Sequence, residues 1–464
     1  MANSNSPKEF SLGLNRRRFL YLSGLAASAV ALTGCTTPGP RFKLPSEKLN
    51  IGAIGVGGKG ASDVGGCEKE NIVAICDVDE NTLNRSGQKY PGATKYSDYR
   101  KMLEKQKDLD AIIVSTADHH HFLASMLAVE NGQHVYCQKP LTHSIWEART
   151  LTEAARKKKV ATQMGNQGRC GEGVRQVCEM IWSDAIGDIR EVHSWTDRPI
   201  WPQGFGRPQG NDPAPAILDW DVWIGPAPMR PFVAKWPDST APDYKRGGRA
   251  IYHPFGWRGF WDFGCGALGD MGCHIMDPAV WALKLESPTS VEPVEIVGVS
   301  ADMAPSASVL RYRFPTRGNL PAVSYFWYDG GKIPAKPMEM EGARLASSGT
   351  LFVGSKGKLL CDAYGGNPTL LPESRMKDYV MPAKSIPRIP NNNGYEDWIR
   401  ACKGGPEACS NFNVAGPFTE TVLLGNLALR LNKKIDWDSK NMRAANAPEA
   451  ASMIRREYRK GWSI

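Results

Sequence analysis

The sequence predicts an α/β protein with a parallel sheet in its first half and a largely antiparallel sheet in its second half. From Leu49 onward, short apolar runs alternate with helical segments, which is the order of parallel strands joined by crossover helices. After about Gly171, apolar runs follow one another without such helices, which indicates an antiparallel sheet. A chain of 464 residues is long enough for about two or three domains.

Composition excludes several classes of protein. Hydrophobic residues make up 42% of the chain and charged residues 23%, which excludes collagen-like, disordered and polytopic membrane proteins. The formal net charge of +9 comes from 57 basic and 48 acidic residues. Beyond the N-terminus there is one short basic run, residues 156–159, so nucleic acid is not a predicted partner.

The N-terminus has the pattern of an export signal. Arginines at 16–18 precede an apolar segment that is too short and too rich in small residues for a transmembrane helix. We therefore predict a twin-arginine signal peptide over residues 1–34. The run Leu-Thr-Gly-Cys that ends at Cys35 predicts lipidation of this cysteine, with a linker over 35–48. The alternative is a disordered basic tail before a weak helix.

These signals predict a periplasmic or cell-envelope protein that meets the membrane through its lipid anchor only. Because the twin-arginine route carries folded proteins, a nucleotide cofactor loaded before export is expected to be held tightly and recycled in place. The 11 cysteines include no Cys-x-x-Cys pair, so no redox motif or zinc framework is predicted. Cys76 and Cys137 lie in apolar runs and are expected to be buried thiols.

Residues 49–170 are predicted to form the first domain. Its apolar runs are bounded by turn residues, and its helical segments carry apolar residues at helical spacing. The predicted strands are 49–55, 71–77, 110–116, 133–138 and 160–165, and the predicted helices are 59–68, 97–107, 119–131 and 144–158.

A glycine-rich turn follows the first predicted strand. The pattern Gly-x-Gly-x-x-Gly places Gly55 in the tight turn, Gly57 and Gly58 beside a pyrophosphate, and Gly60 where helix and strand pack closely. The start of the next helix offers free N–H groups to the anion. This strand, turn and helix together predict a Rossmann domain that binds a dinucleotide.

Asp77 ends the second predicted strand, about where a ribose-binding acid falls in such domains. A carboxylate there accepts hydrogen bonds from a 2′-hydroxyl and repels a 2′-phosphate, which favours NAD over NADP. The alternative is a solvated carboxylate at a strand end.

A polar loop follows the third predicted strand. Ser115 and Thr116 lie where such sheets bind their ligand, so both are predicted to contact the cofactor. The three histidines at 119–121 could indicate a metal site. Adjacent side chains on a helix point in different directions, however, so they do not converge on one ion. We predict no metal site.

Residues 171–464 are predicted to form a domain for substrate binding and oligomerisation. The irregular stretch 196–260 is long for a structureless loop and rich in tryptophan, which indicates a functional segment with one or two tryptophans against a substrate. The predicted strands are 189–195, 291–299, 309–314, 322–327 and 349–353, and the predicted helices are 394–403 and 416–432.

A further helix is predicted from about Gly269 to Leu285. Its i,i+4 spacing places Asp270 and His274 on one face, where the histidine, titrating near working pH, can move a proton. The alternative is a structural hydrogen bond between the two side chains.

Three motifs occur in a characteristic order: the glycine-rich turn, the run Gln138-Lys139-Pro140, and Asp270 followed four residues later by His274. In this order the chain resembles the Gfo/Idh/MocA oxidoreductases over roughly residues 49–435. The resemblance implies a Rossmann domain, a C-terminal α/β domain with an open, largely antiparallel sheet, and a homo-oligomer, a dimer or tetramer.

The resemblance also implies roles for single residues. Lys139 corresponds to the catalytic lysine beside the nicotinamide, and the peptide bond before Pro140 to a cis bond. Asp270 and His274 correspond to the family's Asp-x-x-x-His, and His121 to a histidine near the cofactor. Gln138 stands where the family has a glutamate, which removes a charge that would help to hold the lysine.

Polar residues at the predicted domain junction suit a carbohydrate. We predict substrate contacts for Asn166, Gln167 and Arg169, which follow the last strand of the first domain, and for Arg258 and Asp262.

Three functions fit the sequence. The first is an oxidoreductase that acts on a secondary hydroxyl of a sugar, glycoside or cyclitol with a tightly bound NAD, in which Lys139 or His274 takes the hydroxyl proton. The second is an NAD-dependent, redox-neutral glycoside hydrolase of the same fold. The third is a noncatalytic sugar-binding lipoprotein.

Overall fold

The computed structural model describes residues 39–237, 250–340, 342 and 344–463. The predicted export signal and the predicted lipidation site Cys35 lie outside these residues. Among the described residues, every helix is too short or too polar to cross a membrane.

The first sheet has six strands in the order β3-β2-β1-β4-β5-β6, and all its pairs are parallel. The chain order reverses between β1 and β4, and at such a switch point the carboxyl ends of the strands open a crevice for ligands. The predicted parallel sheet is confirmed. Its strands are β1 (Asn50–Ile54), β2 (Asn71–Cys76), β3 (Thr94–Tyr96), β4 (Ala111–Val114), β5 (His134–Cys137) and β6 (Thr162–Met164).

The predicted helices of this half are also confirmed, within a few residues at their ends. A helix and a strand over 80–96 were not predicted, because α3 buries only Leu83 and so carries almost no apolar periodicity. The helices are α2 (Lys59–Gly66), α3 (Glu80–Lys89), α4 (Tyr99–Lys105), α5 (Asp118–Glu130) and α6 (Ile145–Lys158).

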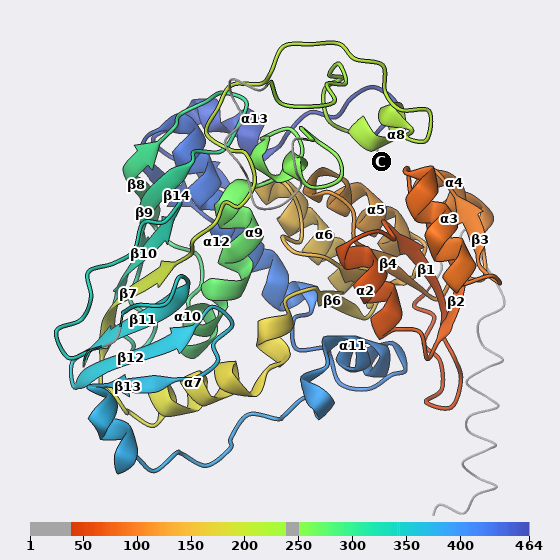
Figure 1. The fold of residues 1–464 in the computed structure, drawn as a ribbon. Coiled ribbons are helices and arrows are strands. Elements are labelled where there is room, and N and C mark those ends of the chain that lie inside the picture. Colours follow the sequence, from red (N-terminus) through yellow and green to blue (C-terminus); the bar gives the residue numbers. More distant parts are fainter. Residues whose placement is uncertain (1–38, 238–249, 341, 343, 464) are drawn as a thin grey trace, which may run out of the picture. The chain divides into compact units, whose positions relative to one another are not determined.

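The second sheet has nine strands, in the order β13-β12-β11-β7-β10-β9-β8-β14-β15 (Figure 1). The prediction of an antiparallel sheet holds for every pair except β7 with β10, which run parallel at its centre. Its strands are β7 (Ile189–Trp195), β8 (Ser290–Val297), β9 (Ala307–Phe314), β10 (Val323–Asp329), β11 (Gly349–Gly354), β12 (Gly357–Asp362), β13 (Thr369–Leu371), β14 (Ile435–Asp438) and β15 (Arg443–Ala444).

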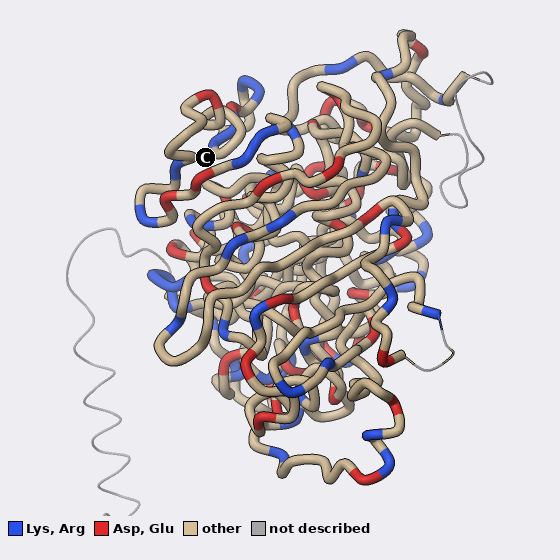
Figure 2. The backbone as a smooth tube through the Cα atoms, turned by 90° about the vertical axis from the view of Figure 1, so that its left-hand side faces the viewer, with Lys and Arg blue, Asp and Glu red and all other residues tan. Residues whose placement is uncertain are grey.

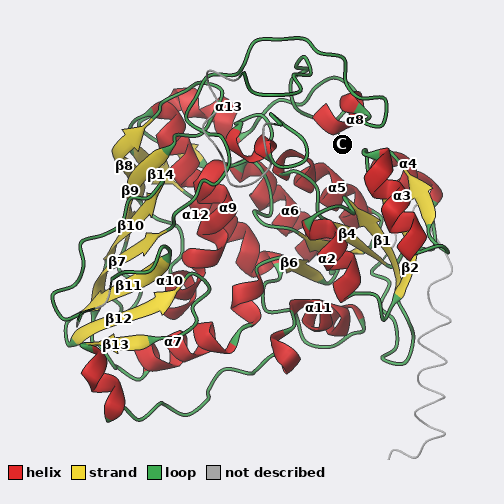
Figure 3. Cartoon of the chain, viewed as in Figure 1, coloured by secondary structure: helices red, strands yellow, loops and turns green. Residues whose placement is uncertain are grey.

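Helices lie between the two sheets, and Figure 3 shows them as a layer with the nine-stranded sheet on its outer side. Two helices of the second half return to the first domain: α12 packs on α6, whereas α11 buries Trp398 and Cys402 with α2 on the opposite face of the six-stranded sheet. The longer helices of this half are α7 (Glu172–Trp182), α9 (Gly266–Ile275), α10 (Asp277–Ala282), α11 (Gly394–Cys402) and α12 (Phe412–Leu431). Short helices α8 (Trp220–Ile224) and α13 (Ala451–Ile454) complete the set of described α-helices.

The prediction of one helix from Gly269 to Leu285 was wrong. The helix ends at Ile275, and α10 begins at Asp277 with Pro278 in its first turn. Proline has no N–H to donate to the carbonyl four residues earlier, so it starts a new helix rather than continuing the old one.

The ten cysteines of the described residues are all free thiols, and Cys76 and Cys137 are buried in their strands as predicted. Blue and red segments, for basic and acidic residues, are interspersed over the tube in Figure 2.

Candidate active site

The turn after β1 has the conformation that a dinucleotide site requires. Gly55 adopts a positive φ of 77°, and a Cβ there would stand 2.6 Å from the carbonyl oxygen of Ser115. A Cβ on Gly60 would stand 1.8 Å from the carbonyl oxygen of Gly55, so only glycine lets α2 start this close to the strand. Gly57 and Gly58 complete the turn; Gly58 is exposed, with open space where a Cβ would be.

The helix that follows this turn offers donors to an anion. The N-cap of α2 is Gly58, and no side chain caps the helix. Within this turn the Gly60 N–H donates to the carbonyl of Gly57 (2.8 Å), so a pyrophosphate would be bound by the other N–H groups of the first turn. This is the arrangement into which NAD fits.

Asp77, directly after β2, braces the same turn. One carboxylate oxygen accepts from the Val56 N–H (2.9 Å) and the other from the Asp79 N–H (3.0 Å). Burial raises its pKa above the usual value, which these hydrogen bonds partly offset. Each oxygen keeps a lone pair that a ribose hydroxyl can use.

Four side chains donate hydrogen bonds to Asp63, a buried carboxylate on α2. Lys59 (2.6 Å), Tyr395 (2.8 Å) and Ser115 (2.6 Å) each donate to it. The Gln138 amide donates to both of its oxygens, at 3.1 and 2.9 Å. This arrangement explains why position 138 has an amide where the family has a glutamate: a second carboxylate would lie about 3 Å from the first.

Lys139, the next residue, turns toward the second domain. Its Nζ donates to the carboxylate (2.8 Å) and to the backbone carbonyl (2.8 Å) of Asp270 on α9. Arg258 approaches the same carboxylate oxygen at 3.4 Å. These two cations hold the pKa of Asp270 well below its usual value despite burial. The peptide bond between Lys139 and Pro140 is cis, as predicted.

His274 lies one turn further along α9. Its Nδ1 is 3.1 Å from the amide oxygen of Asn166, an acceptor, so Nδ1 carries the hydrogen and Nε2 keeps a lone pair. Burial and the nearby charge of Lys139 lower its pKa to about 3. The prediction that this histidine titrates near working pH was therefore wrong: the buried ring is neutral. The centre of the His274 ring also lies 5.0 Å from the centre of the Tyr364 ring.

Asp118, at the start of α5, joins the two domains at this point. Its carboxylate accepts from the N–H of Cys265, the N-cap residue of the helix that carries Asp270 and His274. Burial raises its pKa to about 7, although Lys139 and Arg258 act in the opposite direction.

The loop after β4 lies at the edge of this crevice. Ser115 and Thr116 are half-buried there. His121 is within hydrogen-bonding distance of the carbonyl oxygens of Pro140 (2.7 Å) and Thr116 (3.1 Å), so it ties together the loops that follow β4 and β5. Burial lowers its pKa to about 4.

Two predicted substrate residues have other partners. Arg169 is buried and paired with Asp277 at 2.5 Å, with its guanidinium 4.3 Å from the ring centre of Trp281. In this structure Arg169 braces the two domains, and its contact with a substrate stays a prediction. Asp262 pairs with Arg207 (2.6 Å) and Arg230 (2.8 Å).

The structure thus brings together Lys139, Asp270, His274, Asn166 and Arg258. Gln167 is exposed and lies outside this group of contacts. Sequence reasoning missed other residues that organise the site: Asp63, Tyr395, Asp118 and Tyr364. For the first of these, the i,i+4 spacing to Lys59 was an available signal.

The chain matches two family models. The first, described as an oxidoreductase family with an NAD-binding Rossmann fold, matches residues 49–166. The second, described as the C-terminal alpha/beta domain of an oxidoreductase family, matches residues 201–464.

Curated relatives resemble part of the chain. Inositol 2-dehydrogenase of Salmonella typhimurium is 29% identical over 154 residues, which cover 31% of this chain and 45% of the relative. Glycosyl hydrolase family 109 protein 2 of Shewanella sp. strain ANA-3 is 27% identical over 204 residues, or 38% of this chain and 44% of the relative. The chain therefore spans less than half the length of these relatives.

Solved structures share the fold. The WlbA dehydrogenase of Bordetella pertussis, solved with NADH and UDP-GlcNAcA, has a TM-score of 0.57 at 16% identity over 84% of this chain and 99% of that one. The aldose-aldose oxidoreductase of Caulobacter crescentus, solved with glycerol, has a TM-score of 0.53 at 14% identity over 84% of this chain and all of the other.

Proposed function

Because the chain belongs to the Gfo/Idh/MocA family of NAD-binding oxidoreductases, we propose that it oxidises a secondary hydroxyl of a sugar, glycoside or cyclitol. The observation that carries this proposal is the contact between Lys139, at the carboxyl end of β5, and Asp270, on the helix of His274. It sets a cation, a carboxylate and a neutral imidazole at the edge of the sheet where a dinucleotide site opens.

The chemistry that NAD supplies when bound is acceptance of a hydride from a carbon that carries a hydroxyl group. The uncapped start of α2 and the turn around Gly58 are the groups that would hold its pyrophosphate, and Asp77 its ribose. The same carboxylate favours NAD over NADP.

His274 and Lys139 have different roles toward the substrate hydroxyl group. The Nε2 lone pair of His274 accepts the proton, because Nδ1 is committed to Asn166 and the ring is neutral. Lys139, held by Asp270, donates a hydrogen bond to the oxygen and stabilises the negative charge that develops on it. This stabilisation matters because an imidazole of such low pKa is a weak base. Arg258 is proposed to orient the substrate.

A second function has support from the relatives. Glycosyl hydrolase family 109 proteins are among the proteins to which residues of this chain are similar. In a redox-neutral hydrolase, oxidation of a sugar hydroxyl to a ketone acidifies the adjacent C–H, which permits elimination of the aglycone, addition of water and reduction back to the alcohol.

The cellular location and the oligomeric state of the protein are also proposals. We propose a twin-arginine lipoprotein of the cell envelope that retains its NAD, and a homo-oligomer. Two exposed valines of β8, Val294 and Val297, are the observation that favours self-association through this sheet.

The test is a substrate screen of the purified chain after its NAD content has been measured. Free sugars and cyclitols are compared with chromogenic glycosides. Reduction of bound NAD by a free sugar or cyclitol, without aglycone release, is the expected result. Aglycone release without net NADH favours the hydrolase instead, and sugar binding without either reaction favours a binding protein.

A further inference from the structure

We propose that Cys170 and Cys409 are an oxidisable pair, the site of a disulfide that fastens the substrate side of the active site to the loop between α11 and α12. Cys170 ends the short helix that follows β6, and Cys409 lies between α11 and α12. This inference concerns a modification site and does not depend on the proposed reaction.

The two sulfur atoms are already in contact. Their Sγ atoms are 3.0 Å apart, and a disulfide bond of about 2.05 Å requires only a small further approach. Cys170 is buried, whereas Cys409 is the one described cysteine that is partly exposed. One sulfur is therefore accessible to an oxidant, and the other lies directly behind it.

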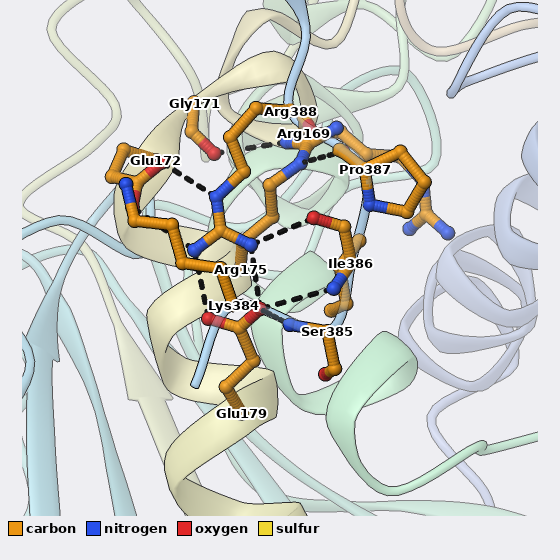
Figure 4. A network of polar contacts seen from close by, with 10 residues as sticks. All are labelled: Arg169, Gly171, Glu172, Arg175, Glu179, Lys384, Ser385, Ile386, Pro387 and Arg388. Carbon is orange, nitrogen blue, oxygen red and sulfur yellow. Dashed lines mark hydrogen bonds and ion pairs between the residues drawn. The ribbon is translucent and has the colours of Figure 1, made fainter. Parts of the chain in front are cut away.

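The backbones that carry the two sulfurs are fixed by side chains. Arg169 donates to the carbonyl of Cys409 (2.8 Å), and the N–H of Cys409 donates to Asp397 (2.7 Å). Arg175 donates to the carbonyls of the residues on either side of Cys170, Arg169 (2.7 Å) and Gly171 (2.9 Å). Figure 4 shows this arginine within a network that also includes Arg388. The sulfur contact is thus held by the surrounding structure.

A metal site is the competing explanation, since Asp397 lies close to both sulfurs. Two thiolates that bind one zinc ion at about 2.3 Å in a tetrahedral site stand roughly 3.8 Å apart, which is further than these sulfurs. Asp397 is also engaged, by the N–H of Cys409 and by Arg400. The disulfide fits better.

Formation of the bond requires a disulfide oxidant, such as glutathione disulfide or an oxidising thiol–disulfide oxidoreductase. The more exposed thiol, Cys409, loses its proton and attacks the oxidant, forming a mixed disulfide and releasing one thiol. Cys170 then loses its proton and attacks the sulfur of Cys409, releasing the second thiol. Two S–H bonds are replaced by one S–S bond, and the oxidant is reduced to two thiols.

The bond would act on the active site through a short segment. Asn166 and Cys170 are four residues apart, and Asn166 accepts the hydrogen bond that orients His274. Oxidation is therefore expected to fix this segment and to raise the melting temperature by about 5 °C.

The experiment is oxidation of the full folded chain with glutathione disulfide, then alkylation of the remaining thiols and tryptic mass spectrometry without reduction. Trypsin releases peptides 170–175 and 404–430, each with a single cysteine. A linked pair of these two peptides is expected. Cys409→Ser abolishes both the linkage and the gain in melting temperature, whereas the control Cys178→Ser, at another buried cysteine, retains both.

Three results would overturn the proposal. The first is alkylation of both cysteines after oxidation, which means that no bond forms. The second is a stable glutathione adduct on Cys409 that Cys170 does not displace. The third is a stoichiometric zinc ion that shields both thiols until a chelator removes it, which establishes a metal site instead.

Discussion

Two carboxylates of this protein are bound by adjacent residues, one by a neutral amide and the other by a cation. Asp63, in the nucleotide-binding domain, is bound by the neutral amide of Gln138 together with Lys59, Ser115 and Tyr395. Asp270, in the second domain, is bound by the cation of Lys139. The first cluster fixes the turn and helix of the cofactor site. The second exposes a charged donor where a substrate oxygen can reach it.

The two residues that follow β5 therefore have different roles, one at the cofactor site and one at the substrate site. The backbone after β5 presents consecutive side chains in opposite directions, one into each domain. A change in the Asp63 cluster should therefore alter cofactor binding, and a change in the Asp270 cluster should alter catalysis.

The largest effect is expected from Lys139→Ala. Loss of the cation removes the charge that stabilises the developing alkoxide, so kcat should fall by about 10³-fold or more while NAD affinity changes little. Steady-state kinetics and NAD titration of the same preparation measure both quantities. A parallel loss of NAD binding would contradict the separation of the two clusters.

A smaller loss is expected from His274→Gln, on the order of 10²-fold in kcat. Because the pKa of His274 is about 3, its protonation should not limit the wild-type rate between about pH 5 and 7. A pH–rate profile tests this directly. An acid limb near pH 6.5 that the variant lacks would show that the histidine titrates there after all.

Gln138→Glu should break the Asp63 cluster. Two carboxylates would then face each other, so NAD affinity should fall by about tenfold with little change in kcat. The double variant Asp63→Asn, Gln138→Glu exchanges the two groups and should recover most of the affinity. If the double variant does not regain NAD affinity, the contact between positions 63 and 138 is not the cause of the loss.

The smallest effect concerns stability at Asp118. Its pKa is raised to about 7, so the folded chain keeps a proton that the unfolded chain releases above about pH 4. Stability is therefore lost as the pH rises from about 4 to 7. Asp118→Asn keeps the acceptor for Cys265 without the charge and should stabilise the protein by on the order of 2 kcal/mol at pH 8, with the gain vanishing near pH 4.

Thermal melts at both pH values check this prediction. The control Asp378→Asn, at an exposed carboxylate, should show no such difference. A gain of equal size at both pH values would contradict the assignment.

Much of the fold was predictable because the parallel strands are buried apolar runs with helical segments between them. The glycine turn was predictable for the same kind of reason, since Gly55 and Gly60 occupy positions where a Cβ would collide. The nine-stranded sheet was predicted less completely, because β12 is largely half-buried and β13 to β15 are short.

The active site was predictable only where a motif marked it. Lys139, Asp270 and His274 stood in recognisable patterns, and the structure brings them together. The low pKa of the histidine was not predictable, because burial and the distance to a cation exist only in the folded chain. Likewise, Arg169 has the chemistry of a substrate ligand, and only the fold reveals its partner Asp277.

The most direct test of the central claim is transfer of hydrogen from a substrate carbon to NAD. The protein is incubated with NAD and a panel of sugars and cyclitols that carry deuterium on carbon, and the cofactor is analysed by mass spectrometry. We expect NADH that carries one deuterium with at least one compound, and none with Lys139→Ala. A protein that binds NAD and the compounds but leaves the cofactor unlabelled across the panel would contradict it.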